Sequence, residues 1–244
     1  MQPGWGAVGF VLGMVISSFG ATWAIRRARG EQAFSGRSSC DQCRQVLSYA
    51  ETLPLVGFMM LGGRCRYCNG SIDRFHPIAE LGGGLLLGAI LLLLDWPLSA
   101  VEGALAITLY VLALVDLKTL TLPNIGVAVA TVFCLLLGWL SHDLTVNLII
   151  TVIIGLALTG LAEGMKRTHG RTMLGGGDIK LIAALSLWLG PDICLALALG
   201  SVLGLLQVWL SPARPGLIAF GPALIAGALI IGLCIRPWFT LGGL

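Results

Sequence analysis

The sequence predicts an all-α integral membrane protein of about eight transmembrane helices, with its N-terminus outside and one small cytoplasmic segment between helices 1 and 2. Two observations lead to this fold class. Of the 244 residues, 57% are hydrophobic and only 11% are charged, whereas soluble domains carry about 25% charged residues. The apolar residues also form long runs, and an uncharged run of about 20 residues can cross the bilayer as a helix.

Eight apolar runs are candidate spans. The first run has no charged residue before it and no convincing small-residue cleavage site, so we interpret it as a retained helix rather than a signal peptide. The runs cover residues 5–25, 78–94, 100–115, 125–140, 144–162, 179–189, 193–210 and 217–235.

The basic residues predict the orientation of these helices. Cytoplasmic loops of membrane proteins carry an excess of Lys and Arg. With the N-terminus outside, 14 of the 15 basic residues face the cytoplasm, and only Arg236 lies on the outer side. The net charge of +3 is therefore a topology signal and does not indicate a nucleic-acid-binding surface.

Four cysteines mark the cytoplasmic segment as a candidate metal centre. They stand in two Cys-x-x-Cys pairs, Cys40 with Cys43 and Cys65 with Cys68. Two such pairs can close a tetrahedral zinc site. The 21 residues between the pairs are one more than the usual range. Two disulfides or a redox pair are the alternatives, but a reducing cytoplasm and the lack of a βαβ setting disfavour them.

These features divide the chain into three expected parts. Residues 1–25 form the first transmembrane helix, 26–77 the cytoplasmic four-cysteine segment with a structural Zn²⁺, and 78–244 a seven-helix transmembrane domain.

Two aspartates are the candidate catalytic residues. Asp116 stands at the cytoplasmic end of the third span, and Asp178 at the start of the sixth. The two spans between them deliver both carboxylates to the same face of the membrane. Gly175, Gly176 and Gly177 precede Asp178, and residues without a Cβ let a peptide approach the backbone closely.

A pair of carboxylates can supply an acid and a base. At close range one tends to hold a proton while the other stays charged. The charged member can activate a water molecule against a peptide carbonyl, and the protonated member can donate to the leaving amine. Three alternatives stay open: solvated carboxylates at helix ends, a proton-coupled transporter, or a non-catalytic scaffold with a zinc module.

At these residues the chain resembles the prepilin peptidase family, membrane aspartic proteases of the Gly-x-Gly-Asp type. The resemblance is carried by "GGGDIKLIAAL" around Asp178, by Asp116 with the following "LPN", by the two cysteine pairs, by "RFHPIAEL" and by "FGP" at 220–222. The chain departs from the family pattern in the first span, where Ala21 replaces an asparagine.

The resemblance implies the activity and its partners. Family members remove the basic leader peptide from type IV prepilins or type II secretion pseudopilins, at the cytoplasmic side of the bacterial inner membrane. Those with the cysteine segment usually also methylate the new N-terminal residue with S-adenosylmethionine. Glu80, near the start of the second span, is a candidate for a methyl-transfer or substrate pocket. The N-terminus would then be periplasmic, and membrane lipid surrounds the helices. The sequence does not specify an oligomeric state.

Overall fold

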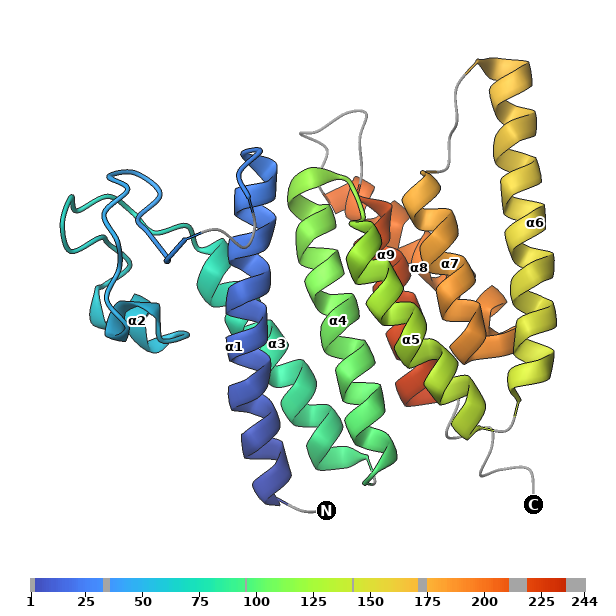
Figure 1. The fold of residues 1–244 in the computed structure, drawn as a ribbon, viewed down its shortest axis with the longest axis horizontal. Helices are drawn as coiled ribbons and strands as arrows, with labels where there is room; N and C mark the ends of the chain where they lie inside the picture. The colour runs from blue at the N-terminus through green and yellow to red at the C-terminus, as the bar shows by residue number, and fades with distance from the viewer. Residues whose placement is uncertain are drawn as a thin grey trace. The chain divides into compact units, whose positions relative to one another are not determined.

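The computed structural model describes residues 3–32, 36–94, 96–141, 143–170, 175–210 and 219–235 (Figure 1). These residues form helices and loops, and within them there is no β-strand, only two isolated antiparallel bridges. The prediction of an all-α protein is confirmed. The chain forms two compact units, Met1–Gly103 and Ala104–Leu244.

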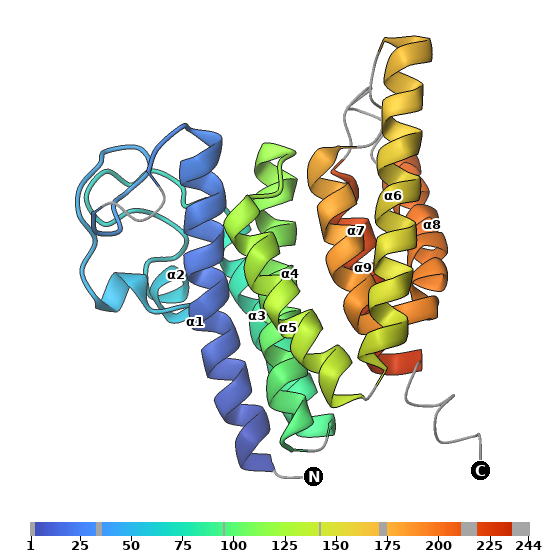
Figure 2. The ribbon, with the colours of Figure 1, turned by 45° about the vertical axis from the view of Figure 1, so that its right-hand side comes forward.

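The first unit consists of two long helices and the cysteine-containing segment between them. Its elements are α1 (Pro3–Ala28), η1 (Ala50–Thr52), α2 (Val56–Met60), α3 (Phe75–Leu93) and the first residues of α4 (Leu98–Thr119). In Figures 1 and 2, α1 and α3 lie side by side.

Glycines allow α1 and α3 to pack closely. A Cβ on Gly9 would lie 2.8 Å from the carbonyl oxygen of Leu87, and a Cβ on Gly13 would overlap the backbone of Gly83. Small residues at such an interface bring helix backbones together, which is a common source of helix association in membranes. This contact fixes the position of α3, and therefore of Glu80, against α1.

The second unit holds the remaining helices. They are the rest of α4, then α5 (Asn124–Leu140), α6 (Leu144–His169), α7 (Gly176–Leu189), η2 (Gly190–Asp192), α8 (Ile193–Leu210), α9 (Phe220–Leu229) and the π-helical turn η3 (Ile230–Ile235). Helix α7 contacts α5, α6 and α9, and α8 packs against α9. Figure 2 shows α6 beside α7.

Polar contacts fix α7 against α6. Asn147 of α6 is 1% exposed, and its Nδ2 donates to the carbonyl oxygen of Leu187 at 3.0 Å. One turn further, the hydroxyls of Thr151 and Ser186 lie 2.9 Å apart. Buried polar groups are costly unless they are hydrogen-bonded, so these pairs set the register of the helix that carries Asp178.

Every predicted apolar run coincides with a helix in the described residues. Among the described residues, five helical stretches are long and apolar enough to cross a membrane: Gly4–Ala28, Phe75–Leu93, Leu98–Thr119, Leu144–Thr168 and Gly176–Leu210. Two shorter apolar helices are Asn124–Leu140 and Phe220–Ile235.

The stretch from Gly176 to Leu210 corresponds to two of the predicted spans. Its 35 residues are interrupted at Gly190, which has a φ of +57° and ends α7. The number of crossings, eight, and the outer position of the N-terminus stay predictions. Residues 217 and 218 of the last predicted span, and Arg236, lie outside the described residues.

Candidate active site and metal centre

Asp116 is a buried carboxylate near the end of α4. Its side chain is 5% exposed, although the sequence places it only three residues before the helix ends at Thr119. The chain leaves α4 through Leu120, which has a φ of +53°. The Leu120 N–H donates to the Asp116 carbonyl at 2.8 Å. This reversal directs the following residues toward the start of α5.

Asp178 lies in the first turn of α7. The three glycines before it have the expected place: Gly175 is the residue before the helix, and Gly176 and Gly177 are its first two residues. Gly175 and Gly176 are exposed. A Cβ on Gly175 would lie 3.0 Å from Oδ2 of Asp178, so the glycine backbone lies directly against the carboxylate.

The loop after Asp116 lies against the start of α7. A Cβ on Gly177 would lie 3.1 Å from Cβ of Leu122. Lys180 donates from Nζ to Oδ1 of Asn124, the first residue of α5, at 3.0 Å. The structure therefore brings both aspartates into one region of the second unit.

Gly221 contacts Asp116, and the sequence alone does not predict this contact. Its N–H, in the first turn of α9, donates to Oδ2 of Asp116 at 3.2 Å. A Cβ at this position would lie 2.6 Å from the same oxygen, closer than real Cβ contacts allow. The signal in the sequence is a glycine between Phe220 and Pro222 at the start of an apolar run, but a sequence does not reveal which side chain that glycine faces.

The four predicted cysteines form one cluster in the first unit. Their sulfur atoms all lie within 4.8 Å of one another. Cys40 and Cys68 are 3.9 Å apart, as are Cys43 and Cys65. A disulfide needs about 2.05 Å, whereas four sulfurs about 2.3 Å from a tetrahedral zinc are separated by about 3.8 Å. The donor set and its spacing therefore fit a metal ion.

The two Cys-x-x-Cys loops share one backbone conformation. In the first, the Cys40 N–H donates to Gln45, and Arg44 has a φ of +59°. In the second, the Cys65 N–H donates to Gly70, and Asn69 has a φ of +54°. Each loop also points an N–H at the first sulfur, from Gln42 to Cys40 and from Tyr67 to Cys65, both at 3.4 Å. These donors favour the negatively charged thiolate that a metal requires.

The thiol of Cys65 shows this effect most directly. Backbone N–H donors from Cys68 and Tyr67 lower the pKa of Cys65 to about 7. A thiolate is therefore accessible near neutral pH at this position.

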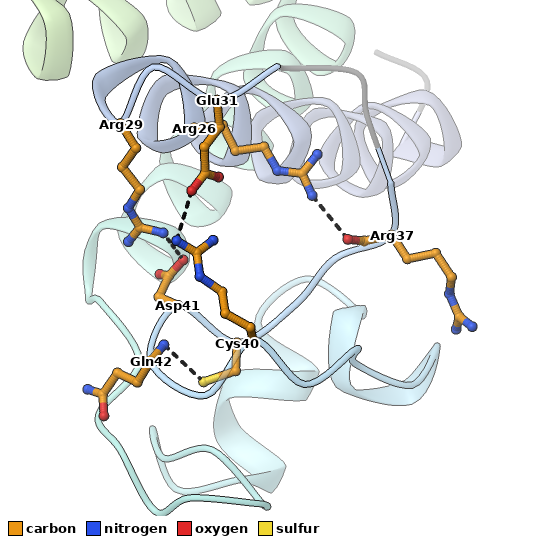
Figure 3. Close-up of polar contacts among 8 residues, drawn as sticks. Arg26, Arg29, Glu31, Arg37, Cys40, Asp41 and Gln42 are labelled. Atoms are coloured by element: carbon orange, nitrogen blue, oxygen red, sulfur yellow. Dashed lines mark hydrogen bonds and ion pairs between the residues drawn. The ribbon is translucent and has the colours of Figure 1, made fainter.

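Ion pairs attach the first cysteine loop to the end of α1 (Figure 3). Arg29 contacts Asp41 at 2.6 Å, and Arg44 contacts Glu31 at 2.9 Å. Arg26 donates to the carbonyl oxygen of Arg37 at 3.1 Å. These three contacts connect residues at and just after the end of α1 to the segment that carries the first cysteine pair.

A cavity of about 450 Å³ lies between the cysteine segment and α1. Glu80 lines it and is 6% exposed. Oε1 of Glu80 accepts from the Ser18 hydroxyl at 2.6 Å, and Oε2 accepts from the Leu55 N–H at 2.7 Å. Glu51 also lines the cavity, and its Oε1 is buried with no hydrogen-bond partner. Cavities of about 300–1,000 Å³ are typical of small-molecule sites.

Two protein families match the chain, one over the part that holds the cysteine cluster and one over the part that holds the two aspartates. The profile of the bacterial peptidase A24 N-terminal domain matches residues 11–94, and that of the type IV leader peptidase family matches residues 103–235. The first match contains the cysteine cluster and Glu80, and the second contains Asp116 and Asp178.

Curated relatives carry the name prepilin leader peptidase/N-methyltransferase. The protein of Burkholderia pseudomallei (strain 1026b) is 32% identical over 226 residues, which cover 85% of this chain and 70% of the relative. That of Pectobacterium carotovorum is 34% identical over 206 residues, covering 79% and 72%. That of Bacillus subtilis is 28% identical over 237 residues, covering 91% of each.

No solved structure matches the chain. The two profile matches and the curated relatives nevertheless establish its ancestry: the chain belongs to the type IV leader peptidase family.

Proposed function

We propose that this protein is a membrane aspartic endopeptidase that removes the basic leader peptide from type IV prepilins or type II secretion pseudopilins, and that it methylates the new N-terminal residue. It acts in the bacterial inner membrane, with its active site facing the cytoplasm. The observation that carries the proposal is that the loop after Asp116 contacts the start of α7, the helix that carries Asp178, in a unit that matches the leader peptidase family. The transporter and scaffold alternatives are not favoured, since the curated relatives are named as enzymes.

Asp116 and Asp178 are the proposed catalytic pair. The ionised carboxylate accepts a proton from a water molecule as the water attacks the scissile carbonyl. The protonated partner donates to the oxyanion and then to the leaving amine. Gly175 to Gly177 leave the backbone before Asp178 open to an extended substrate. The Gly221 N–H fixes one oxygen of Asp116, so its other oxygen is left for the reaction.

Methyl transfer is proposed for the cavity of the first unit. S-adenosylmethionine, when bound, would supply an electrophilic methyl group, which is attached to a positively charged sulfonium sulfur. The lining suits such a cation, because it combines the rings of Phe19 and Phe58 with carboxylates. The unpartnered Oε1 of Glu51 can accept a hydrogen bond from this ligand. The Ser48 N–H holds the pKa of Glu51 below its usual value, so Glu51 stays ionised.

The other residues of this unit have supporting roles in the proposal. Both oxygens of Glu80 are already hydrogen-bonded, so Glu80 shapes the cavity and connects α1, the Leu55 loop and α3. The four cysteines hold a structural Zn²⁺ that fixes the two cysteine loops relative to each other.

Replacing either aspartate by asparagine should stop cleavage. Asparagine keeps the size of the side chain but cannot exchange a proton, and general acid or base catalysis contributes about 10²- to 10⁴-fold. We expect Asp116→Asn and Asp178→Asn each to lower the rate of prepilin cleavage by at least about 10²-fold. The assay follows release of the leader from a prepilin by purified protein in detergent.

Glu163→Gln is the matched control for the aspartate variants. Glu163 is an exposed carboxylate of α6 in a surface pair with Arg167 at 3.6 Å, and its loss should leave cleavage unchanged. Cleavage at a near wild-type rate by folded Asp116→Asn or Asp178→Asn protein would contradict the proposal that the two aspartates are the catalytic pair.

Gly221→Ala should lower the rate of turnover, and it should destabilise the fold no more than the control variant Gly227→Ala. The added Cβ displaces the carboxylate of Asp116 from its position, and a misplacement of about 1 Å at a reacting group can cost about 10²-fold. We expect kcat to fall by up to about 10²-fold with little change in KM. Steady-state kinetics with a prepilin peptide measure both quantities.

Gly227→Ala separates positioning from packing. A Cβ at Gly227 would lie 2.6 Å from the Ala196 carbonyl oxygen, as close as the contact at Gly221, but it faces α8 and not Asp116. This variant should lower thermal stability while its folded fraction keeps the wild-type kcat. If both variants lose kcat equally, Gly221 has only a packing role.

Removing one metal ligand should separate the two reactions. Cys43→Ser leaves three thiolates, so the zinc content should fall from about one ion per chain. Because the cluster supports the cavity of the first unit, methyl transfer should fall strongly while leader cleavage stays within a few-fold of wild type. Elemental analysis, methyl incorporation and cleavage are measured on one preparation.

Cys194→Ser is the control for the metal variant, since Cys194 is a free, exposed cysteine of α8. It should change neither zinc content nor either activity. Equal loss of cleavage and methylation in Cys43→Ser would argue that the cluster supports the whole protein.

A further inference from the structure

We propose that residues 52–63, which include α2, insert into the cytoplasmic interface of the membrane and contact lipid acyl chains. We call these residues the insertion segment. The four-cysteine module would then be held to the bilayer by its own apolar loop, in addition to α1 and α3. This inference does not depend on either proposed activity.

The composition of the insertion segment suits a lipid environment. Its sequence, "TLPLVGFMMLGG", has no charged residue, and charged residues Glu51 and Arg64 flank it directly. Its large apolar side chains are nevertheless exposed: Leu53 is 52% exposed, Val56 48%, Met59 77% and Met60 71%. An apolar patch of this kind marks a contact with a membrane or another molecule.

Hydrogen bonds place this segment at membrane depth. Leu55, the residue before α2, donates its N–H to Oε2 of Glu80 at 2.7 Å. Glu80 is five residues after Phe75, where α3 begins, and is therefore about 7.5 Å along that helix at about 1.5 Å per residue. All 19 residues of α3 are needed to cross a hydrocarbon core of about 30 Å. Leu55 thus lies below the level at which α3 enters the membrane.

The contact with α1 gives a similar depth. Glu80 also accepts from Ser18 at 2.6 Å, and Ser18 is ten residues before the end of α1 at Ala28, a distance of about 15 Å along the helix. The 26 residues of α1 span about 39 Å, which is about 9 Å more than a core of about 30 Å. With this excess on the cytoplasmic side, Ser18 lies about 6 Å inside the core. In both ribbon views α2 lies beside α1 between its two ends (Figures 1 and 2). Interfacial helices bury their apolar face by about 5–10 Å, which agrees with this position.

The two faces of the insertion segment have different surroundings. Phe58 and Leu61 line the cavity, and Gly57 is buried against the backbone of Glu51. Met59 and Met60, by contrast, are exposed. Exposed apolar residues of α3 near Glu80, Ile78 at 67% and Leu81 at 44%, belong to a spanning helix whose outer surface faces lipid. The occupant that fits both surfaces is therefore the acyl-chain region of the bilayer.

Lipid quenching of a fluorescent side chain tests the insertion. A fluorescent amino acid is introduced by codon suppression in place of Met59, and the full chain is reconstituted in phosphatidylcholine vesicles with and without brominated acyl chains. Two positions serve as controls: Val11 of α1, 54% exposed within a span, and Tyr67 of the second cysteine loop, 52% exposed. Circular dichroism and thermal unfolding of each labelled protein, compared with the unlabelled chain, confirm that it is folded.

The position of the label decides the outcome. We expect brominated lipid to quench the label at 59 nearly as strongly as at 11 and several-fold more than at 67, while aqueous iodide quenches mainly the label at 67. Strong iodide quenching at 59, with no more lipid quenching than at 67, would overturn the proposal. That result would instead leave Met59 and Met60 as a surface for a protein partner.

Discussion

A carboxylate that is buried in an apolar helix bundle must find hydrogen-bond donors in the protein, because burial removes most of the water that would solvate it, and this constraint governs both units of the protein. Asp116 is 5% exposed and Glu80 is 6% exposed. Each carboxylate accepts a hydrogen bond from a backbone N–H at the start of another helix. The donor to Asp116 is Gly221, at the start of α9, and the donor to Glu80 is Leu55, just before α2. Each bond ties a distant part of the chain to a spanning helix, and so defines the candidate active site in one unit and the cavity in the other.

Glycines make these contacts geometrically possible. At Gly221 any side chain would collide with the carboxylate that its N–H must reach. At Gly13 the missing Cβ allows α1 and α3 to approach until their backbones touch, which brings Ser18 within hydrogen-bond distance of Glu80. Glycine at both positions lowers the intrinsic stability of the helix. It also allows the close approach through which a buried polar group obtains its hydrogen bond.

The sequence alone predicts the helices and the metal ligands well, because these are local features. Apolar runs mark each candidate spanning helix among the described residues, and the spacing of Cys40, Cys43, Cys65 and Cys68 predicts a cluster that the structure assembles. The contacts of Gly221 and Leu55 join residues 105 and 25 positions apart, and no local pattern contains that information. The insertion segment could not be recognised for the same reason: the five residues of α2 are too few for a span, and only the bond to Glu80 gives their depth.

The central claim is that Asp116 and Asp178 act as one catalytic unit, and a double-mutant cycle tests it most directly. Single-turnover cleavage of a prepilin is measured with enzyme in excess for wild type, Asp116→Asn, Asp178→Asn and the double variant, with mass spectrometry to detect slow product formation. Residues that act together give strongly non-additive effects, so the double variant should be no slower than the slower single variant. Losses that multiply in the double variant would show that the two carboxylates work independently and would contradict the account.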